Sequence, residues 1–225
     1  MKGTALMFIV NCINITDEGQ DWDALYAQAS EGRRRRADKF MFPDDRKRCL
    51  CAELLMRYSL FTGRGIRFTG EPLLGKYGKP YIQGAEDFFF SASHSGKWVV
   101  TAYGSSQVGA DVEVIKSGSS SIAEGCFTQS EQDYVFADDE GADERFIRLW
   151  TLKESYIKYL GTGLSTPLDS FTVYADRDPI CTDADDSLTF TNIRFDHEHY
   201  LSVCGAGGVS ALNTVTVNGC LEALR

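Results

Sequence analysis

The stretch LWTLKESYIKYLGTGLS, residues 149–165, combines the pattern of an amphipathic helix with a lysine on its apolar side. At about 100° per residue, the apolar side chains of this segment fall within one arc of the helix surface. Lys153 lies in the middle of that arc, and a buried lysine is rarely kept without a partner. Glu154 and Lys158 lie at one margin, four residues apart and therefore neighbours on the surface. Gly161 predicts a left-handed end to the helix. The apolar arc consists of Phe146, Leu149, Trp150, Tyr156, Ile157 and Leu160.

Each of these polar residues also has an ordinary structural explanation. Lys153 could extend its ammonium past the apolar side chains to water. Glu154 and Lys158 could form a surface ion pair between successive turns. The helix alone does not separate these explanations from a functional site, so the rest of the chain has to decide.

The composition of the chain limits its class. Its 225 residues, 43% hydrophobic and 12% aromatic, are typical of a soluble globular protein with one large domain or two smaller halves. No apolar run approaches the roughly 20 residues of a membrane span, and residues 5–15 are interpreted as a buried strand and not as a signal peptide. A net charge of −9 argues against general nucleic-acid binding.

The seven cysteines form no CxxC pair, and the three histidines complete no zinc spacing. The cysteines are interpreted as reduced, mostly buried thiols, which favours a cytoplasmic protein. The basic residues concentrate in GRRRRADKF and DDRKR, near residues 32–48. Such runs are usually solvated helix faces, but they could also bind a polyanionic small molecule.

Helical and strand patterns recur in the same order along the chain. Helices are expected at residues 21–39 and 44–62, with Gly63 ending the second, followed by strands at 80–83, 88–93, 98–103 and 108–115. After the loop KSGSSS, helices are expected at 129–138 and 143–160, and strands near 170–175, 187–195, 199–204 and 209–217. We therefore predict an α/β (α+β) fold of two similar halves related by pseudo-twofold symmetry, residues 1–115 and 116–225, with the active site between them.

The segment VGADVEVI places two carboxylates on one face of a strand. Asp111 and Glu113 face one way, and the alternate apolar residues face the other. The two acidic positions are about 6–7 Å apart along the strand. Two like charges so close favour a hard cation such as Mg2+ between them. A solvent-exposed strand face is the alternative, and for an isolated DxE it is the more common one.

Two further segments carry residues suited to phosphate. FFFSASHSG leads an aromatic strand into Ser91, Ser93 and His94, which could donate to a phosphate. GKYGKP places Lys79 and Pro80 at the end of a glycine-rich turn, where a backbone can approach a ligand closely. A structural histidine and a solvated loop are the respective alternatives.

Taken in order, GKP, FSASHS, GADVE and WTLKESYIKYLGTGL resemble the motifs of the Sfp-type 4'-phosphopantetheinyl transferase family. The resemblance spans roughly residues 78–173. Two positions depart from the family pattern: Ser91 stands where Asn is usual, and Ala110 where Ile or Val is usual. The family fold has two similar halves, which agrees with the recurrence of elements.

The resemblance implies that the 4'-phosphopantetheine arm of coenzyme A is transferred to a serine of an apo acyl or peptidyl carrier protein, with release of 3',5'-ADP. It implies Mg2+ ligands at Asp111, Glu113 and Glu154, and it makes Glu154, Lys158, His94 and Asp111 the candidate catalytic residues. Glu154 could act as base, as metal ligand or as both. Residues implied to bind coenzyme A are Arg35, Arg48, Lys79, Pro80, Ser93, His94, Lys153 and Lys158. Arg35 is preferred within the run Arg33 to Arg36, one or more of which could contact the nucleotide, and Lys153 could instead reach a structural carboxylate.

Other functions remain open from the residues alone. The same carboxylates could serve a metal-dependent nucleotide phosphohydrolase, which needs only water as nucleophile, or the chain could be a non-catalytic module that binds coenzyme A. For the transferase we expect a monomer without nucleic-acid or membrane partners. Its carrier is expected to contact the loop KSGSSSIAEGCFTQSE through Ile122 and Phe127. The alternative is a mobile linker whose two apolar residues pack back onto the core.

Overall fold

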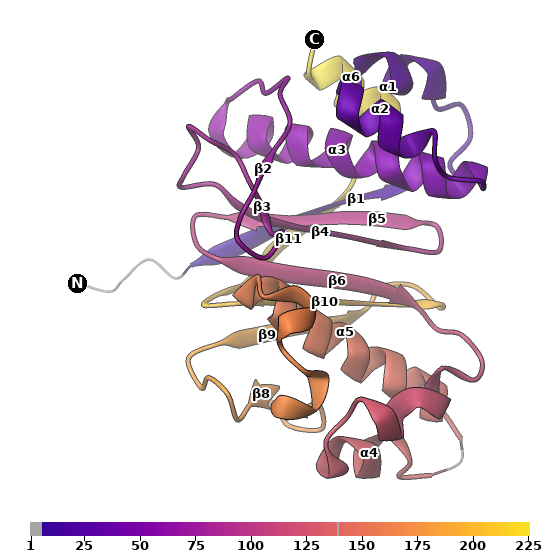
Figure 1. The fold of residues 1–225 in the computed structure, drawn as a ribbon, viewed down its shortest axis with the longest axis vertical. Helices are drawn as coiled ribbons and strands as arrows, with labels where there is room; N and C mark the ends of the chain where they lie inside the picture. The colour runs from indigo at the N-terminus through magenta and orange to yellow at the C-terminus, as the bar shows by residue number, and fades with distance from the viewer. Residues whose placement is uncertain (1–5, 139) are drawn as a thin grey trace.

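Two sheets pack face to face at the centre of the molecule, and each carries one long helix on its outer side (Figure 1). The computed structural model describes residues 6–138 and 140–225. The first sheet has the strand order β11-β1-β5-β4, and the second has the order β6-β10-β9. The fold is therefore a mixed α+β arrangement of two halves, as the recurrence of elements predicts.

The elements of the first part of the chain are β1 Met7–Asn14, α1 Trp22–Gln28, α2 Glu31–Ala37, α3 Pro43–Arg64, β2 Leu73–Leu74, β3 Pro80–Tyr81, β4 Phe89–Ser95 and β5 Trp98–Gly104. Those of the second part are β6 Val108–Val114, the 3-10 helix η1 Ser119–Gly125, α4 Gln129–Val135, α5 Ala142–Leu160, η2 Gly163–Ser165, η3 Leu168–Ser170, β7 Val173–Tyr174, β8 Cys181–Thr182, β9 Thr189–Arg194, β10 His199–Gly205, β11 Gly208–Thr214 and α6 Val217–Ala223.

Three apolar layers hold these elements together. The sheets meet through fully buried side chains of alternate positions, among them Val10 and Val100 on one side and Ala110 and Leu201 on the other. The inner face of α3 packs on the first sheet, and the inner face of α5 packs on the second. The expected alternation in the strand 108–115 is confirmed, because Val108, Ala110 and Val112 are all buried in the central layer.

Strand pairing divides the chain differently from the expected boundary between residues 115 and 116. β6 pairs antiparallel with β10 and so belongs to the second sheet. After β10 the chain returns to the first sheet, where β11 lies parallel to β1 and α6 packs on α3. The C-terminal residues thus complete the N-terminal half.

Three expected helix boundaries were wrong, among them the end of the helix expected at 129–138, which stops at Val135. The helix expected at residues 21–39 is two helices, because Ser30 is extended and its hydroxyl accepts from the Arg33 N–H at 3.1 Å to begin α2. The helix α3 continues past Gly63 and ends at Gly65, which has φ 70°. No helix in the described ranges is both long and apolar enough to cross a membrane.

Candidate active site

Glycine at position 109 lets helix α5 approach strand β6 closely. A Cβ on Gly109 would lie 1.9 Å from the Ser155 carbonyl oxygen and 2.3 Å from the Tyr159 nitrogen. Any side chain there would force the helix away from the strand. Because the two backbones are in contact, residues on this side of α5 meet the outward-facing carboxylates of β6.

Asp111 and Lys158 form the centre of this contact. The Lys158 ammonium donates to Asp111 Oδ1 at 2.6 Å and to the Ser93 hydroxyl at 2.9 Å, and Ser93 donates to the same carboxylate oxygen at 2.7 Å. Asp111 is only 2% exposed, so the exposed-strand alternative does not hold for it. Strands β4 and β6 and helix α5 therefore converge on one carboxylate.

A row of serines on β4 joins the two sheets along β6. Ser91 accepts from the Ala110 N–H at 3.0 Å, and Ser95 donates to Glu113 Oε2 at 2.5 Å while accepting from the Val114 N–H at 3.2 Å. The hydroxyls take the place of backbone pairing between strands of different sheets. This role for Ser91 explains how serine serves at a position where the family pattern has asparagine.

Glu113 and Glu154 flank Asp111 in a partly buried environment. Burial raises the pKa of the Glu113 carboxyl, against the hydrogen bond from Ser95, and the charge of Asp111 raises it further. Burial also raises the pKa of Glu154, again with a contribution from Asp111. Three carboxyl groups near one another favour either protonation or a bound cation.

His94 lies near the end of strand β4, at an exposed position among positively charged side chains. Desolvation of the ring lowers its pKa, and the cations Arg48 and Lys158, with a smaller contribution from Arg36, lower it further. Arg48 is held in place by Asp45 at 2.5 Å and by the Gly96 carbonyl oxygen. A neutral imidazole among fixed cations is suited to receive an anion.

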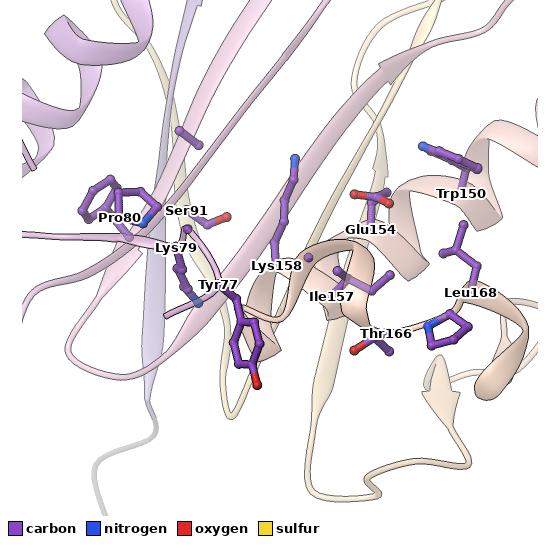
Figure 2. Close-up of a pocket in the computed structure, with 16 residues that line it drawn as sticks. Tyr77, Lys79, Pro80, Ser91, Trp150, Glu154, Ile157, Lys158, Thr166 and Leu168 are labelled. Carbon is purple, nitrogen blue, oxygen red and sulfur yellow. The ribbon is translucent and has the colours of Figure 1, made fainter. Parts of the chain in front are cut away.

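A pocket of about 540 Å³ opens beside these residues, between the two halves. Figure 2 shows Tyr77, Lys79 and Pro80 on one side, Trp150, Glu154 and Leu168 on the other, and Lys158 between them. The remaining walls are largely apolar. They include Gly78, Phe90, Ser91, Ala92, Ile157, Gly161, Gly163, Thr166 and Pro167.

One carboxylate oxygen of this cluster is left without a partner among the residues that the structure describes. Within the described part of the chain, Asp111 Oδ2 is buried and has no hydrogen-bond partner. Hard carboxylate oxygens are the donors that Mg2+ prefers, so the chemistry of the donor set fits this ion. No group of three or more His, Cys, Asp or Glu side chains among the described residues is arranged to hold a metal ion.

Comparison with known proteins agrees with this geometry. Residues 107–205 match the model of the 4'-phosphopantetheinyl transferase superfamily, and residues 16–106 match that of the 4'-phosphopantetheinyl transferase N-terminal region. A 4'-phosphopantetheinyl transferase of Bacillus subtilis is 34% identical over 190 residues, which cover 82% of this chain and 85% of the relative. The chain belongs to the 4'-phosphopantetheinyl transferase superfamily.

Two other members show the range of the superfamily. The 4'-phosphopantetheinyl transferase Sfp of Bacillus subtilis strain 168 is 37% identical over 156 residues, covering 66% of this chain and 67% of the relative. An L-aminoadipate-semialdehyde dehydrogenase-phosphopantetheinyl transferase of Xenopus laevis is 30% identical over 199 residues, covering 76% and 66% respectively.

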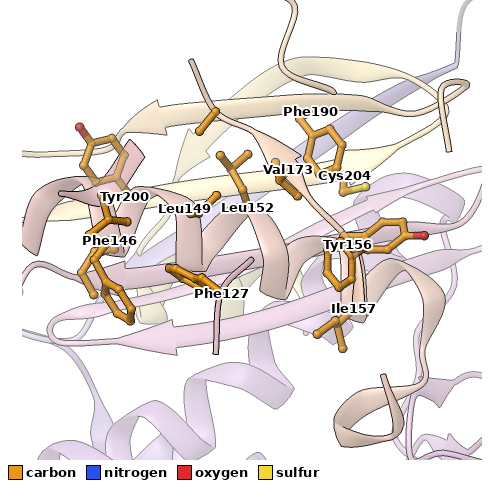
Figure 3. Packing of buried hydrophobic residues seen from close by; sticks show 14 of the residues in the cluster. Phe127, Phe146, Leu149, Leu152, Tyr156, Ile157, Val173, Phe190, Tyr200 and Cys204 are labelled. Atoms are coloured by element: carbon orange, nitrogen blue, oxygen red, sulfur yellow. The ribbon is translucent and has the colours of Figure 1, made fainter. Parts of the chain in front are cut away.

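Lys153, expected to contact coenzyme A, lies instead in the core of the C-terminal half of this transferase. Its ammonium is completely buried, pairs with Glu131 Oε1 and donates to the Phe171 carbonyl oxygen at 2.6 Å. It also lies over the Phe171 ring, 4.1 Å from the centroid. Figure 3 shows the apolar residues of this core around α5, including Phe127 and Tyr156. The ligand contact expected for Lys153 is corrected, because the ammonium is enclosed in the core; the alternative of a structural carboxylate holds, with Glu131 as the partner.

The four arginines of α2 lie in different surroundings, and Arg35, the one expected at the nucleotide, faces solvent. The side chain of Arg35 is 72% exposed and pairs with Glu31 at 3.5 Å, on the solvent side of α2. Arg36, one residue further, is the member of this run whose charge reaches His94. Arg33 and Arg34 bind the protein itself, through Glu53 at 3.3 Å and the Ala29 carbonyl oxygen at 2.6 Å. Neighbouring residues of a helix point about 100° apart, so the four arginines face different surroundings, which a run of identical residues does not indicate.

Lys79 and Pro80 line the pocket, as expected for residues near the ligand. The Lys79 ammonium, however, donates to the carbonyl oxygens of Val108 at 3.0 Å and Tyr159 at 2.9 Å. Ser95 and Glu131 were not among the expected site residues. A signal for Ser95 was present, since it continues the alternation of Ser91 and Ser93, whereas nothing local indicates Glu131.

Proposed function

We propose that this chain transfers the 4'-phosphopantetheine arm of coenzyme A to a serine of an apo acyl or peptidyl carrier protein, with release of 3',5'-ADP. The observation that carries the proposal is the ion pair of Asp111 with Lys158, beside an apolar pocket between the halves that Lys158 and Glu154 line. The pocket suits the uncharged pantetheine arm, and the charged residues beside it suit the pyrophosphate.

In this reaction the serine hydroxyl oxygen forms a bond to the phosphorus that carries pantetheine, and the bond from this phosphorus to the bridging oxygen breaks. The 3',5'-ADP leaves with the electron pair, and the serine proton must be accepted. Glu154 is our candidate for that base, since burial raises the pKa of its carboxyl towards the range in which proton acceptance is effective.

Lys158 and His94 are proposed to hold the phosphate charge. Lys158 already lies between Asp111 and Ser93, so its ammonium is oriented before any ligand binds. Pre-oriented donors stabilise charge that develops in the transition state without the cost of reorganising. Arg48 and Arg36, whose charges reach His94, are proposed to attract the remaining phosphates.

Mg2+ is proposed to be held by Asp111, Glu113 and Glu154. These carboxylates are not arranged as a metal site among the described residues of the free protein, so they would have to converge on the ion, which would then neutralise charge on the pyrophosphate. The free Asp111 Oδ2 and the raised pKa values of Glu113 and Glu154 support a cation at this position. We further propose that the protein acts as a monomer, because both walls of the pocket come from one chain. Its seven free cysteines fit a reducing, cytoplasmic environment.

The test combines the protein with coenzyme A, Mg2+ and an apo carrier protein, and measures the intact mass of the carrier. A gain of one phosphopantetheine group, absent when the acceptor serine is replaced by alanine, is the expected result. Release of nucleotide at the same rate without any carrier would indicate a phosphohydrolase instead. Binding of coenzyme A without either reaction would indicate a non-catalytic module.

A further inference from the structure

The loop that carries Lys79 crosses from the N-terminal half to the end of α5 in the C-terminal half. Strands β2 and β3 form a short hairpin, in which Gly75 N–H donates to the Lys79 carbonyl oxygen at 2.9 Å. From this hairpin the Lys79 side chain extends between the start of β6 and the last turn of α5. Its ammonium reaches the Val108 carbonyl oxygen on the first and the Tyr159 carbonyl oxygen on the second.

The stem of Lys79 occupies space that only a glycine leaves open. Gly161 ends α5 with φ 71°, and a Cβ there would lie 2.8 Å from Lys79 Cδ and 3.3 Å from Lys79 Cβ. The methylene chain therefore packs directly on the backbone of the helix end. Left-handed geometry and close contact both require glycine at this position.

The Lys79 ammonium also stabilises the C-terminal end of helix α5. The last carbonyls of a helix have no intrahelical partner, and a cation near them interacts favourably with the helix dipole. Gln107 Nε2 donates to the same Tyr159 oxygen, so two side chains from outside α5 converge on its end. Burial lowers the pKa of Lys79 to about 8. The titratable group whose charge reaches it is Cys204 on β10, and burial raises the pKa of that thiol well above its usual range.

We infer that the Lys79 side chain is a clamp between the two halves, and that it positions the pocket wall instead of binding a phosphate of the ligand. Its donors are used on Val108 at the start of β6 and on Tyr159 in the last turn of α5. Helix α5 also carries Ile157 and Lys158, which line the pocket opposite Tyr77 and Pro80. That this pocket receives coenzyme A rests on the proposed function, but the clamp is a property of the free protein.

The first experiment therefore uses no substrate. Hydrogen–deuterium exchange of the full-length protein is compared between wild type, Lys79→Met and Lys76→Met. Lys76 is a matched control on the same loop, since it is exposed and lies over Tyr77, 4.9 Å from the ring centroid. We expect exchange around residues 158–163 to rise about three- to tenfold in Lys79→Met only, the effect of losing about one net hydrogen bond. Unchanged exchange in Lys79→Met would overturn the clamp.

A second experiment separates the clamp from a direct phosphate contact, using calorimetric coenzyme A binding between pH 7 and 9.5. A neutral amine still donates two hydrogen bonds, so a clamp survives deprotonation near the pKa of about 8. The ratio of the Kd of Lys79→Met to that of wild type is then expected to remain constant over this range. A ratio that falls towards one as pH rises would show that the charge itself binds the ligand. If Lys79→Met does not fold, loss of wild-type affinity through pH 8 would likewise overturn the clamp, and retained affinity would support it.

Discussion

Helix α5 carries two lysines, five residues apart, in opposite environments. Lys153 is fully buried in the C-terminal core with Glu131, and Lys158 is 29% exposed at the pocket with Asp111. Both ammonium groups pair with a carboxylate and donate to a second partner, yet one contact holds the core and the other borders the ligand pocket. An ion pair is thus assigned to structure or to function by what surrounds it, and the pairing alone does not decide.

The buried pair connects three segments of the C-terminal half. Glu131 accepts from the Val173 N–H at 2.8 Å and from the Thr128 N–H at 2.9 Å, in addition to pairing with Lys153. Burial lowers the pKa of Lys153, and Glu131 opposes that shift. The pair therefore links α4, α5 and β7. The stretch of chain before β7 includes Thr166 and Leu168, which line the pocket.

Among the charged residues of α5, breaking the buried pair is expected to have the largest effect on stability. Lys153→Met leaves the Glu131 carboxylate buried without its cation, and removal of one partner of such a pair costs about 3–5 kcal/mol. Urea unfolding measures this loss. The double variant Lys153→Met/Glu131→Leu should recover part of it, whereas equal stability of wild type and Lys153→Met would contradict the structural role.

Glu154→Gln tests the pocket side of the same helix. Glutamine keeps the shape and removes the basic oxygen, so we expect kcat for carrier modification to fall about 10²–10³-fold. Glu154 makes no side-chain hydrogen bond within the described residues, so Tm should change little. Steady-state kinetics and a thermal melt check both. Retained kcat with weaker coenzyme A binding would remove the assignment as base.

Lys158→Met should combine a functional and a structural effect. Loss of an oriented cation is expected to lower kcat about 10²-fold. Asp111 would keep only its bond from Ser93, so the free energy of unfolding should also fall by about 1–3 kcal/mol. Kinetics at saturating coenzyme A and urea unfolding separate the two. A normal kcat in this variant would mean that the phosphate charge is held elsewhere.

The pH dependences of activity and stability should run in opposite directions at Glu154. Because burial raises the pKa in the folded state above that of the unfolded chain, acidification through this range adds protons preferentially to the folded state and increases its stability. Turnover should fall over the same range, because the protonated carboxyl no longer accepts a proton. Unfolding free energies of wild type and Glu154→Gln are compared as a function of pH. On acidification the wild type should gain stability relative to the variant. A difference in unfolding free energy that does not change with pH would contradict the raised pKa of Glu154.

The smallest effect is expected at the carrier surface. Ile122 is 54% exposed on η1, which Asp143 holds through the Ser120 N–H at 2.8 Å. Ile122→Ser should raise the KM for the carrier about fivefold, the loss of roughly 1 kcal/mol of apolar contact, and leave the KM for coenzyme A unchanged. Equal changes in both KM values would place Ile122 outside the carrier surface.

The structure corrects the expectation that Phe127 contacts the carrier. Phe127 is only 3% exposed and stacks on Phe146, 5.1 Å between centroids, so it belongs to the core. Phe127→Ala should destabilise the fold by about 3–5 kcal/mol, as measured by urea unfolding, and serves as the contrast to Ile122. Local sequence does not tell which apolar residues of this Ser/Gly-rich loop are buried, because Ile122 and Phe127 do not belong to a helix or strand with a repeating apolar pattern.

The amino-acid sequence by itself determined the periodic elements and the motif residues. The alternation in VGADVEVI predicted the burial of Val112 and the shared outward face of Asp111 and Glu113, because strand geometry requires it. The spacing of Glu154 and Lys158, with the stop at Gly161, predicted one helix margin and its end. The recurrence of elements predicted two halves, since similar patterns fold alike.

Tertiary structure alone decided which partner each charged residue meets. Lys153 meets Glu131, and Lys79 meets the Val108 and Tyr159 carbonyls, across separations that leave no mark on the local pattern. The return of β11 to the first sheet was likewise beyond local sequence, because pairing depends on a neighbour just over two hundred residues away. Periodicity is set by the backbone geometry of a single segment. The identity of a charge's partner is set by the packing of several segments, and only the folded chain brings these together.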